Sequence, residues 1–299
     1  MLTSFPDSGI INVPPSLAND LMRAAEALPL YDKKDFYALT LQTLVADTIR
    51  ESCPDGFEWL TGRIGEGVAR WPYCVLIRGL RFDKGHRVFV AINRAFGQMV
   101  ALPYQEPRAQ LIHYIEPHTD KLSARGGRET ERLHTDAADW GKPVGFISML
   151  CARADKRGQG RSRLLDVDAI REEVQTQLGN DSLQVLKTSP VPWQLHASWG
   201  GGVRWQTVLT ESTVFWRRYT ILLAVHEDGA ELSNEMLALL DQFERVIENS
   251  DRRIDFLLQE GELLFSDNRR GVHARTPIVD ADASKRLMIR SWVEAMKME

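Results

Sequence analysis

Two widely separated parts of the chain carry the side-chain types that bind a transition metal. His134 and Asp136 are separated by one residue, so an extended backbone would place an imidazole nitrogen and a carboxylate oxygen on the same side. A further histidine, His273, lies much later in the chain. Two histidines and one carboxylate make the facial triad of non-haem ferrous iron sites, which leaves positions open on the metal. The pattern therefore indicates a metal site made of His134, Asp136 and His273.

The tripeptide that contains this pair occurs twice in the chain. His118-Thr119-Asp120 is identical to His134-Thr135-Asp136, and only one copy can supply the ligands of a single site. The first copy follows a proline and leads into a polar, glycine-bearing segment typical of a surface loop. The second copy leads into residues 144–151, which have the pattern of a buried strand. Because metal ligands need a rigid support, the second copy is favoured.

Two arginines share the last apolar run of the chain, residues 285–292. If this run is a strand, Arg286, Met288 and Arg290 lie on one face, and either face could be the inward one. Two guanidiniums on a buried face would need anionic partners, and a ligand carboxylate bound in bidentate fashion would meet that need. For this run alone, a solvated edge strand is the simpler interpretation. His273 upstream shifts the balance toward a ligand site.

Composition narrows the classes of partner and compartment. The 299 residues carry a net charge of -4 with a pI near 6.0 and no basic run, which disfavours nucleic acid. The three cysteines, Cys53, Cys74 and Cys151, are odd in number and widely spaced, as expected of free thiols in a reducing compartment. No signal-peptide pattern opens the sequence, and no stretch of about 18 apolar residues occurs. We therefore expect a cytoplasmic protein without a membrane partner.

Periodicity separates a helical start from a strand-rich remainder. Residues 1–70 show helical periodicity with proline and serine start signals. Apolar runs predict strands at 73–80, 111–117, 144–151, 263–275 and 285–292, strand and then helix character at 88–96, and alternating strand-like runs over 183–225. A helical insertion is expected at about 231–250. Since no linker divides the chain, the simplest organisation is one domain over 1–299, with a β core over 71–299.

The order and spacing of four segments carry a family resemblance. They are His134-Thr135-Asp136, Gly160-Arg161-Ser162, residues 266–276 and residues 286–290. Together, over about residues 70–293, the chain resembles the taurine dioxygenase and clavaminate synthase-like branch of the iron(II)/2-oxoglutarate-dependent oxygenases. The resemblance implies a mainly β fold with flanking helices, built on a double-stranded β-helix, which is a jelly-roll, cupin-like core.

The resemblance also implies a role for each matching residue. His134, Asp136 and His273 would bind Fe(II). Arg286 would pair with the distal carboxylate of 2-oxoglutarate, assisted by the hydroxyl of Ser162. Arg290 would lie nearer the metal and contact either the keto-acid end of this cosubstrate or an anionic substrate. Ser162 stands where the family more often has threonine, and Ala274 where glycine is common; either hydroxyl can donate a hydrogen bond.

The resemblance implies that O2 and 2-oxoglutarate are consumed, giving succinate and CO2, while an unactivated C–H bond is hydroxylated, desaturated or cyclised. A carboxylate at Asp136 disfavours halogenation, because related halogenases carry a small residue there. We expect a small polar substrate, amino-acid-derived or a secondary metabolite. Its candidate contacts, besides Arg290, are Asp139, Trp140 and Arg204. Residues 118–132 and 200–202 are candidate lid segments.

Two other classes of function stay open on the sequence. A non-catalytic metal-binding barrel, acting as a sensor or scaffold, would be expected to lack a cosubstrate anchor, whereas Arg286 and Ser162 are both present. A zinc hydrolase on a related barrel would need a general base beside a metal-bound water and would be indifferent to 2-oxoglutarate.

Overall fold

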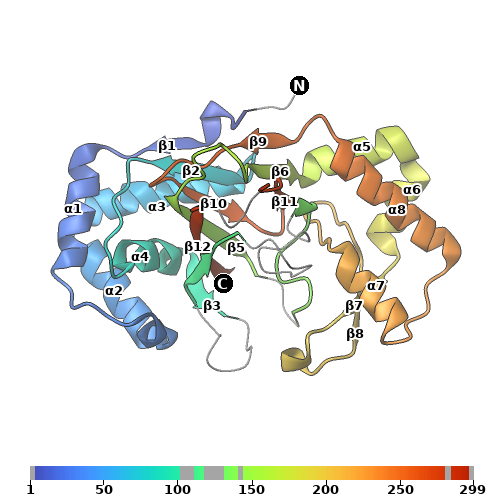
Figure 1. The fold of residues 1–299 in the computed structure, drawn as a ribbon, viewed down its shortest axis with the longest axis horizontal. Helices are drawn as coiled ribbons and strands as arrows, with labels where there is room; N and C mark the ends of the chain where they lie inside the picture. The colour runs from blue at the N-terminus through green and yellow to red at the C-terminus, as the bar shows by residue number, and fades with distance from the viewer. Residues whose placement is uncertain (1–3, 102–110, 118–130, 141–143, 280–283, 296–299) are drawn as a thin grey trace.

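The computed structural model describes residues 4–101, 111–117, 131–140, 144–279 and 284–295. Its strands lie at the centre, with a group of helices on either side (Figure 1). The first group is α1 (Pro15–Glu26), α2 (Leu39–Ser52), α3 (Pro54–Ala69) and α4 (Arg87–Phe96). Proline opens α1 and α3 at positions where its missing N–H costs no helical hydrogen bond. Helical periodicity predicts helices in this part of the chain.

The second group of helices lies on the other side of the strands (Figure 1). It consists of α5 (Val167–Leu178), α6 (Asn180–Thr188), α7 (Arg218–His226) and α8 (Asn234–Asn249). Asp166 and Ser233 cap α5 and α8 by accepting hydrogen bonds from backbone N–H groups of the first turn. Within the described residues, no helix has both the length and the apolarity to cross a membrane.

A large sheet forms one wall of the strand core. Its order is β1-β2-β10-β5-β12-β3, with β4 beside β12, and each pairing except β1 with β2 is antiparallel. The strands are β1 (Ile10–Asn12), β2 (Cys74–Arg78), β3 (Gly97–Val100), β4 (His113–Ile115), β5 (Phe146–Arg153), β10 (Leu263–Asp267) and β12 (Leu287–Ala295). Both sides of β12 are hydrogen-bonded, so the C-terminal arginine run is an inner strand rather than a solvated edge.

A smaller sheet has the order β11-β6-β9. Its strands are β6 (Ser162–Asp166), β9 (Ile254–Phe256) and β11 (Gly271–Arg275). A separate hairpin pairs β7 (Val191–Gln194) with β8 (Val203–Gln206). The segment around His134 adds to the free side of β11 through a bridge between His134 and His273. The two candidate histidine ligands therefore lie at the edge of the smaller sheet, and Asp136 lies in the turn that follows His134.

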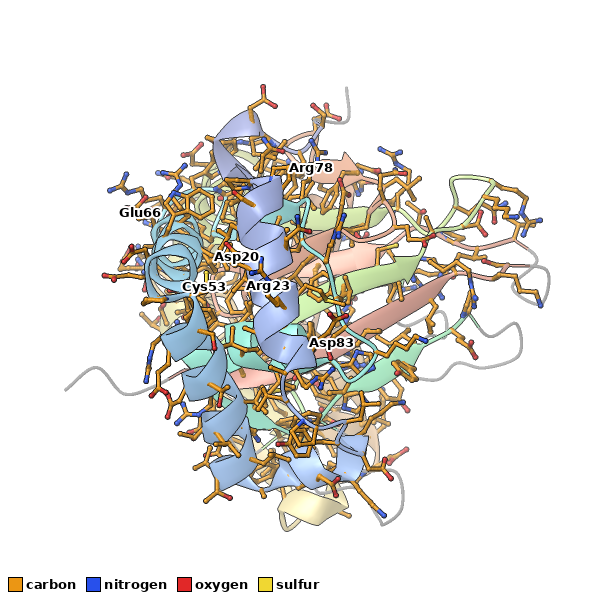
Figure 2. The ribbon with its side chains drawn as sticks, turned by 90° about the vertical axis from the view of Figure 1, so that its left-hand side faces the viewer. Asp20, Arg23, Cys53, Glu66, Arg78 and Asp83 are labelled. Atoms are coloured by element: carbon orange, nitrogen blue, oxygen red, sulfur yellow. The ribbon has the colours of Figure 1, made fainter. Side chains whose placement is uncertain are left out.

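Apolar side chains fill three layers. The N-terminal helices pack on the outer face of the large sheet, with Phe36, Phe89 and Phe265 fully buried between them. Figure 2, viewed from the side of α1, shows these helices over the strands. The second helical group packs on the smaller sheet around Trp216 and Phe243. Residues between the two sheets form a third cluster. This is the mainly β fold with flanking helices that the sequence predicts.

The run 263–275, expected as one strand, is two strands in different sheets. β10 pairs with β2 and β5 in the large sheet, whereas β11 pairs with β6 in the smaller one. The chain changes sheet in a turn at residues 268–270. Alternation of side chains cannot reveal such a change, since both strands are apolar on their inner faces. The turn carries Asn268, which has a structural role at the metal site.

Two other expectations need correction. Residues 88–96 lie wholly in α4, not in a strand followed by a helix. Residues 183–225 hold the end of α6 and most of α7 in addition to β7 and β8. In both places the helices are short, and α4 is largely buried. A short apolar run does not distinguish a helix from a buried strand. The expected insertion at 231–250 contains α8.

Candidate metal centre

His134 and His273 are positioned by direct backbone pairing. The N–H of His134 donates to the carbonyl of His273 at 3.0 Å, and the N–H of His273 donates back at 2.9 Å. Residues paired in this way across antiparallel neighbours present their side chains on the same face. The two imidazole rings accordingly lie with centroids 4.6 Å apart. A contact between distant parts of the sequence thus creates a nitrogen pair.

Asp136 is fixed by the turn between β10 and β11. The side-chain oxygen of Asn268 accepts a hydrogen bond from the Asp136 N–H at 3.0 Å, and its amide nitrogen donates to the Asp136 carbonyl at 3.1 Å. Asn268 is 2% exposed. One buried amide therefore clamps the backbone of Asp136 from both sides. This role of Asn268 was not predicted, although the residue lies inside the motif of residues 266–276.

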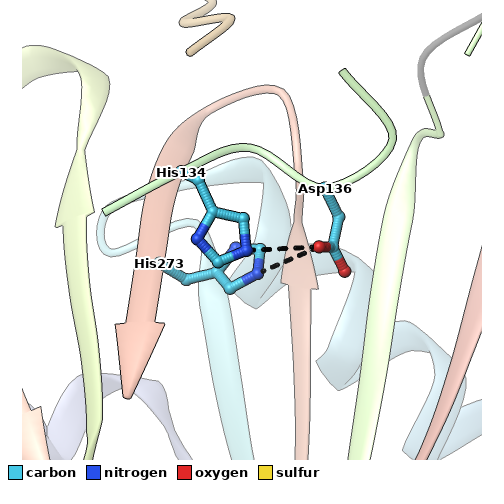
Figure 3. Close-up of side chains that lie close together, drawn as sticks. All are labelled: His134, Asp136 and His273. Atoms are coloured by element: carbon cyan, nitrogen blue, oxygen red, sulfur yellow. Dashed lines mark ion pairs between the residues drawn. The ribbon is translucent and has the colours of Figure 1, made fainter. Parts of the chain in front are cut away.

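The three side chains converge on one point (Figure 3). Asp136 Oδ1 lies 3.4 Å from His134 Nε2 and 3.6 Å from His273 Nε2. One ligand atom from each residue lies within 4.8 Å of the others. In the part of the chain that the structure describes, no other group of three or more histidine, cysteine or carboxylate side chains is arranged in this way. Two imidazole nitrogens and one carboxylate oxygen fit a non-haem iron ion.

The other carboxylate oxygen of Asp136 is held by two donors from β12. Trp292 Nε1 donates to Oδ2 at 2.8 Å, and Arg290 Nη1 donates to the same atom at 3.0 Å. The Arg290 guanidinium also lies over the Trp292 ring, 4.2 Å from its centroid. Oδ2 is therefore engaged, and Oδ1 alone faces the histidines. This arrangement favours a carboxylate that binds a metal through one oxygen.

Electrostatics keep these ligands in the form that binds metal. Burial alone would raise the pKa of Asp136, but the positive charge of Arg290 and the two neighbouring histidines hold that pKa well below its usual value. Burial, reinforced by the charge of nearby His273, lowers the pKa of His134 to about 4. At neutral pH the carboxylate is therefore ionised and His134 is neutral, as metal coordination requires.

Arg286 lies just before β12 as a buried cation. It is 6% exposed, and its guanidinium forms no hydrogen bond or ion pair with the residues that the structure describes. Burial lowers its pKa to about 10. A buried guanidinium without a partner is costly, so this position fits an anionic ligand such as the carboxylate of 2-oxoglutarate. The observation favours a cosubstrate anchor over a plain metal-binding barrel.

The loop before β6 makes room for Arg286. Gly160 has a φ of +68°, and a Cβ placed there would lie 3.1 Å from both Cδ and Nε of Arg286. Ser162 is buried at the start of β6 and is paired in register with Arg275 of β11. No hydrogen bond joins Ser162 and Arg286 in the described structure, so the assisting role of Ser162 stays a prediction.

The residues expected to contact substrate lie at different distances from the ligands. Trp140 is 3% exposed and packs edge-on against Trp292, with ring centroids 5.2 Å apart. Trp292 in turn donates a hydrogen bond to Asp136. Asp139 accepts a backbone hydrogen bond from His196 at its carbonyl. Arg204, on β8, lies over the ring of Phe215. None of these contacts tests a role in substrate binding, which stays a prediction for all three.

Several of the residues singled out in the sequence lie outside the described ranges. They are His118, Asp120 and residues 118–130 of the expected lid.

Trp292 was missed although its alternation with Met288 and Arg290 places it on the same strand face. Extending that pattern by one step would have found it.

The comparisons with known proteins agree with this fold and site. Residues 73–292 match the family model described as taurine catabolism dioxygenase TauD, TfdA family. No curated protein sequence matches the chain significantly. The fold and the site define a non-haem iron, 2-oxoglutarate-dependent dioxygenase. The chain belongs to the TauD, TfdA family.

Solved structures with low sequence identity share the fold. One is an asparagine oxygenase in complex with Fe(II), 2S,3S-3-hydroxyasparagine and succinate, with a TM-score of 0.72 and 15% identity, covering 96% of this chain and 93% of that one. Another is the non-haem iron oxygenase OrfP with Fe and alpha-ketoglutaric acid, with a TM-score of 0.72 and 14% identity, covering 98% and 94%. A third, OrfP with Fe, succinate and (3S)-hydroxy-L-Arg, has a TM-score of 0.70 and 16% identity, covering 96% and 94%. The predicted jelly-roll core is confirmed.

Proposed function

We propose that His134, Asp136 and His273 hold Fe(II), that Arg286 holds the distal carboxylate of 2-oxoglutarate, and that the enzyme oxidises a C–H bond of a small amino-acid-derived substrate. The main observation in support is that a metal-binding triad and an unpaired arginine lie inside the same barrel. A triad of metal-binding side chains, of which His134 and Asp136 are buried, lies at one end of the β12 face, and the buried guanidinium of Arg286, which has no partner among the described residues, lies at the other.

The geometry of β12 supports this division of roles. Arg286 and Arg290 are four residues apart on an alternating face, so their Cα atoms are separated by about 13 Å along the strand. Arg290 reaches Asp136, whereas Arg286 points into the space between the sheets near Cys151. An extended dicarboxylate could therefore reach from the metal to Arg286. When bound, ferrous iron and 2-oxoglutarate supply the oxidising chemistry, with succinate and CO2 as products.

The chain itself contributes binding and placement. Asn268 and Trp292 hold Asp136, the backbone pairing holds the two histidines, and Arg286 fixes the cosubstrate. No side-chain base is needed to remove a hydrogen atom from an aliphatic C–H bond, so accuracy of position decides the product. An amino-acid-derived substrate is supported by the asparagine oxygenase and OrfP structures, which contain hydroxylated amino acids.

The cytoplasm is the proposed compartment. Cys53, Cys74 and Cys151 are all free thiols, and Cys74 and Cys151 are buried between the sheets. Free thiols persist where the environment is reducing. The proposed partner is a small molecule, because His134, Asp136 and Arg286 are buried and a large partner could not reach them.

An anaerobic absorption spectrum tests the proposal without knowledge of the substrate. Protein with ferrous iron should gain a weak charge-transfer band near about 500 nm when 2-oxoglutarate is added, as expected for a keto acid chelated in an open facial site. His134→Ala should abolish the band, and His118→Ala should retain it. A band lost in His118→Ala but kept in His134→Ala would assign the metal to the first copy of the tripeptide. No band in any protein would contradict the proposed cosubstrate.

A further inference from the structure

Several arginines lie in the interior around the metal site, and one of them is not paired with a described carboxylate or assigned to 2-oxoglutarate. Arg290 is paired with Asp136, and Arg275 is paired with Glu131 at 3.4 Å. Arg286 is assigned to the distal carboxylate of 2-oxoglutarate. Arg217 remains: it is 8% exposed and belongs to none of the motifs that carry the family resemblance. A buried cation needs a counter-charge, so the question is what Arg217 binds.

Backbone contacts place Arg217 beside the metal ligands. The N–H of Thr135, the residue between His134 and Asp136, donates to the carbonyl of Trp216 at 2.6 Å. The Trp216 N–H donates to the hydroxyl of Thr135 at 3.1 Å. Residues 216 and 135 are thus direct neighbours, and the residue after Trp216 lies next to the ligand pair.

Alternation of side chains directs Arg217 to the side of the ligands. Trp216 is fully buried against Phe243, in the layer between the smaller sheet and the second helical group. Arg217 has extended backbone angles, φ -160° and ψ 96°, so its side chain leaves the chain on the face opposite to Trp216. That is the face of His134 and Asp136. In agreement, the charge of Arg217 is one of the influences that lower the pKa of His134.

The guanidinium of Arg217 has no anionic partner in the described structure. Its backbone carbonyl accepts from the N–H and hydroxyl of Thr220, but its side chain makes no hydrogen bond or ion pair with the residues that the structure describes. α7 begins at the next residue, so the positive end of this helix lies at the same place. Both features favour negative charge there.

The neighbouring arginine, Arg218, has a carboxylate partner. Arg218 Nη2 lies 2.5 Å from Asp241 Oδ1 of α8, while its Nη1 is buried without a hydrogen-bond partner among the described residues. The two arginines are adjacent in sequence and equal in charge, yet only Arg218 has a carboxylate. Arg218 is therefore a matched control for any substitution of Arg217.

We propose that Arg217 binds an anionic oxygen group of the substrate, a carboxylate or a sulfonate, and so selects anionic substrates and orients them at the metal. This inference rests on the proposed function, because it assumes that iron and 2-oxoglutarate occupy the positions assigned above. An amino acid would satisfy it through its α-carboxylate. A substrate without a negative charge would leave Arg217 buried and unpaired, which disfavours such substrates.

Inorganic sulfate is a suitable probe, since it presents the same oxygen geometry to a guanidinium without requiring the true substrate. Anaerobic protein with ferrous iron and saturating 2-oxoglutarate, which keeps Arg286 occupied, is titrated with sulfate by calorimetry. Wild type and Arg218→Gln should bind sulfate with equal affinity. Arg217→Gln should weaken binding by about 10-fold or more, the usual effect of losing a charged hydrogen bond. Arg217→Lys should restore part of the affinity.

The charge-transfer band is recorded on the same samples and separates two kinds of failure. If the band is absent from wild type, the proposed function fails. If the band is present in wild type and Arg217→Gln, but sulfate binds both equally or binds neither, the role of Arg217 is overturned. If Arg217→Gln does not fold, the comparison of Arg217→Lys with wild type and Arg218→Gln decides: sulfate affinity identical in all three would also overturn it.

Discussion

The indole nitrogen of Trp292 donates a 2.8 Å hydrogen bond to Asp136 Oδ2, the carboxylate oxygen that faces away from the two histidines. Trp292 is 5% exposed, so this bond is shielded from water. Together with Arg290 it leaves Oδ1 as the only carboxylate oxygen turned toward the candidate metal position. A residue that binds no metal itself thus determines how a metal ligand is presented.

Trp292→Phe should lower the affinity for ferrous iron by about 10- to 100-fold, the usual effect of removing a hydrogen bond to a metal ligand. Phenylalanine keeps most of the packing against Trp140, so the change isolates the N–H group. Metal affinity is measured by competition with a coloured chelator. Trp199→Phe is the control, because Trp199 stacks on Trp140 but does not touch Asp136. Equal iron affinity in Trp292→Phe and wild type would show that the hydrogen bond does not support the ligand.

Arg286→Gln should raise the concentration of 2-oxoglutarate needed for half-saturation of the charge-transfer band by about 10- to 100-fold, because a charged hydrogen bond to the carboxylate is lost. Iron binding should be unchanged. Arg78→Gln is the control, since Arg78 already has a carboxylate partner, Glu262. An unchanged requirement for 2-oxoglutarate would remove Arg286 from the cosubstrate site.

Gly160→Ala should also weaken 2-oxoglutarate binding, for a steric reason. The new Cβ would lie 2.9 Å from Ile278 Cδ1 and 3.1 Å from the Arg286 side chain, which must then move. Gly158→Ala is a close control, because its φ of +71° matches the +68° of Gly160 while its Cβ would only meet Leu257 at 3.9 Å. Both variants should lose about 1–2 kcal/mol of stability from backbone strain. Only Gly160→Ala should change the titration with 2-oxoglutarate.

The metal-free protein should lose stability as the pH falls from about 6.5 to about 4. The folded-state pKa of His134 is lowered to about 4, so below 6.5 the unfolded chain binds a proton that the folded chain does not. Stability therefore rises with pH across this window, by about 3 kcal/mol for a shift of this size. The depressed pKa of Asp136 adds a loss that begins near its ordinary value of 3.8 and continues below it.

Denaturant titrations of the metal-free protein at several pH values measure this dependence. His134→Gln removes the titrating group, so its stability should vary less with pH between 6.5 and 4 than that of wild type. The two proteins are compared by the slope of unfolding free energy against pH, because the substitution also changes the absolute stability. Parallel slopes would mean that His134 is not buried in its neutral form.

The sequence by itself determined the chemistry. Residue types and order were enough to propose His134, Asp136 and His273 as ligands, because metal binding depends on functional groups that are written in the sequence. The family resemblance then assigned Arg286 to a carboxylate. The mainly β fold with flanking helices followed from alternation and from the resemblance. The same local reasoning failed over 88–96 and 183–225, where short helices contain apolar runs that resemble strands.

The tertiary structure alone decided which groups meet. His134 and His273 become neighbours through two backbone hydrogen bonds, Asn268 acts because the chain changes sheet at residues 268–270, and Arg217 lies beside the ligands because Trp216 pairs with Thr135. None of these contacts is local, so no spacing rule can reveal them. The sequence contains the groups that bind metal and cosubstrate. The support of Asp136 by Asn268 and Trp292, and the position of the unpaired Arg217 beside the ligands, arise only when distant segments of the chain lie side by side.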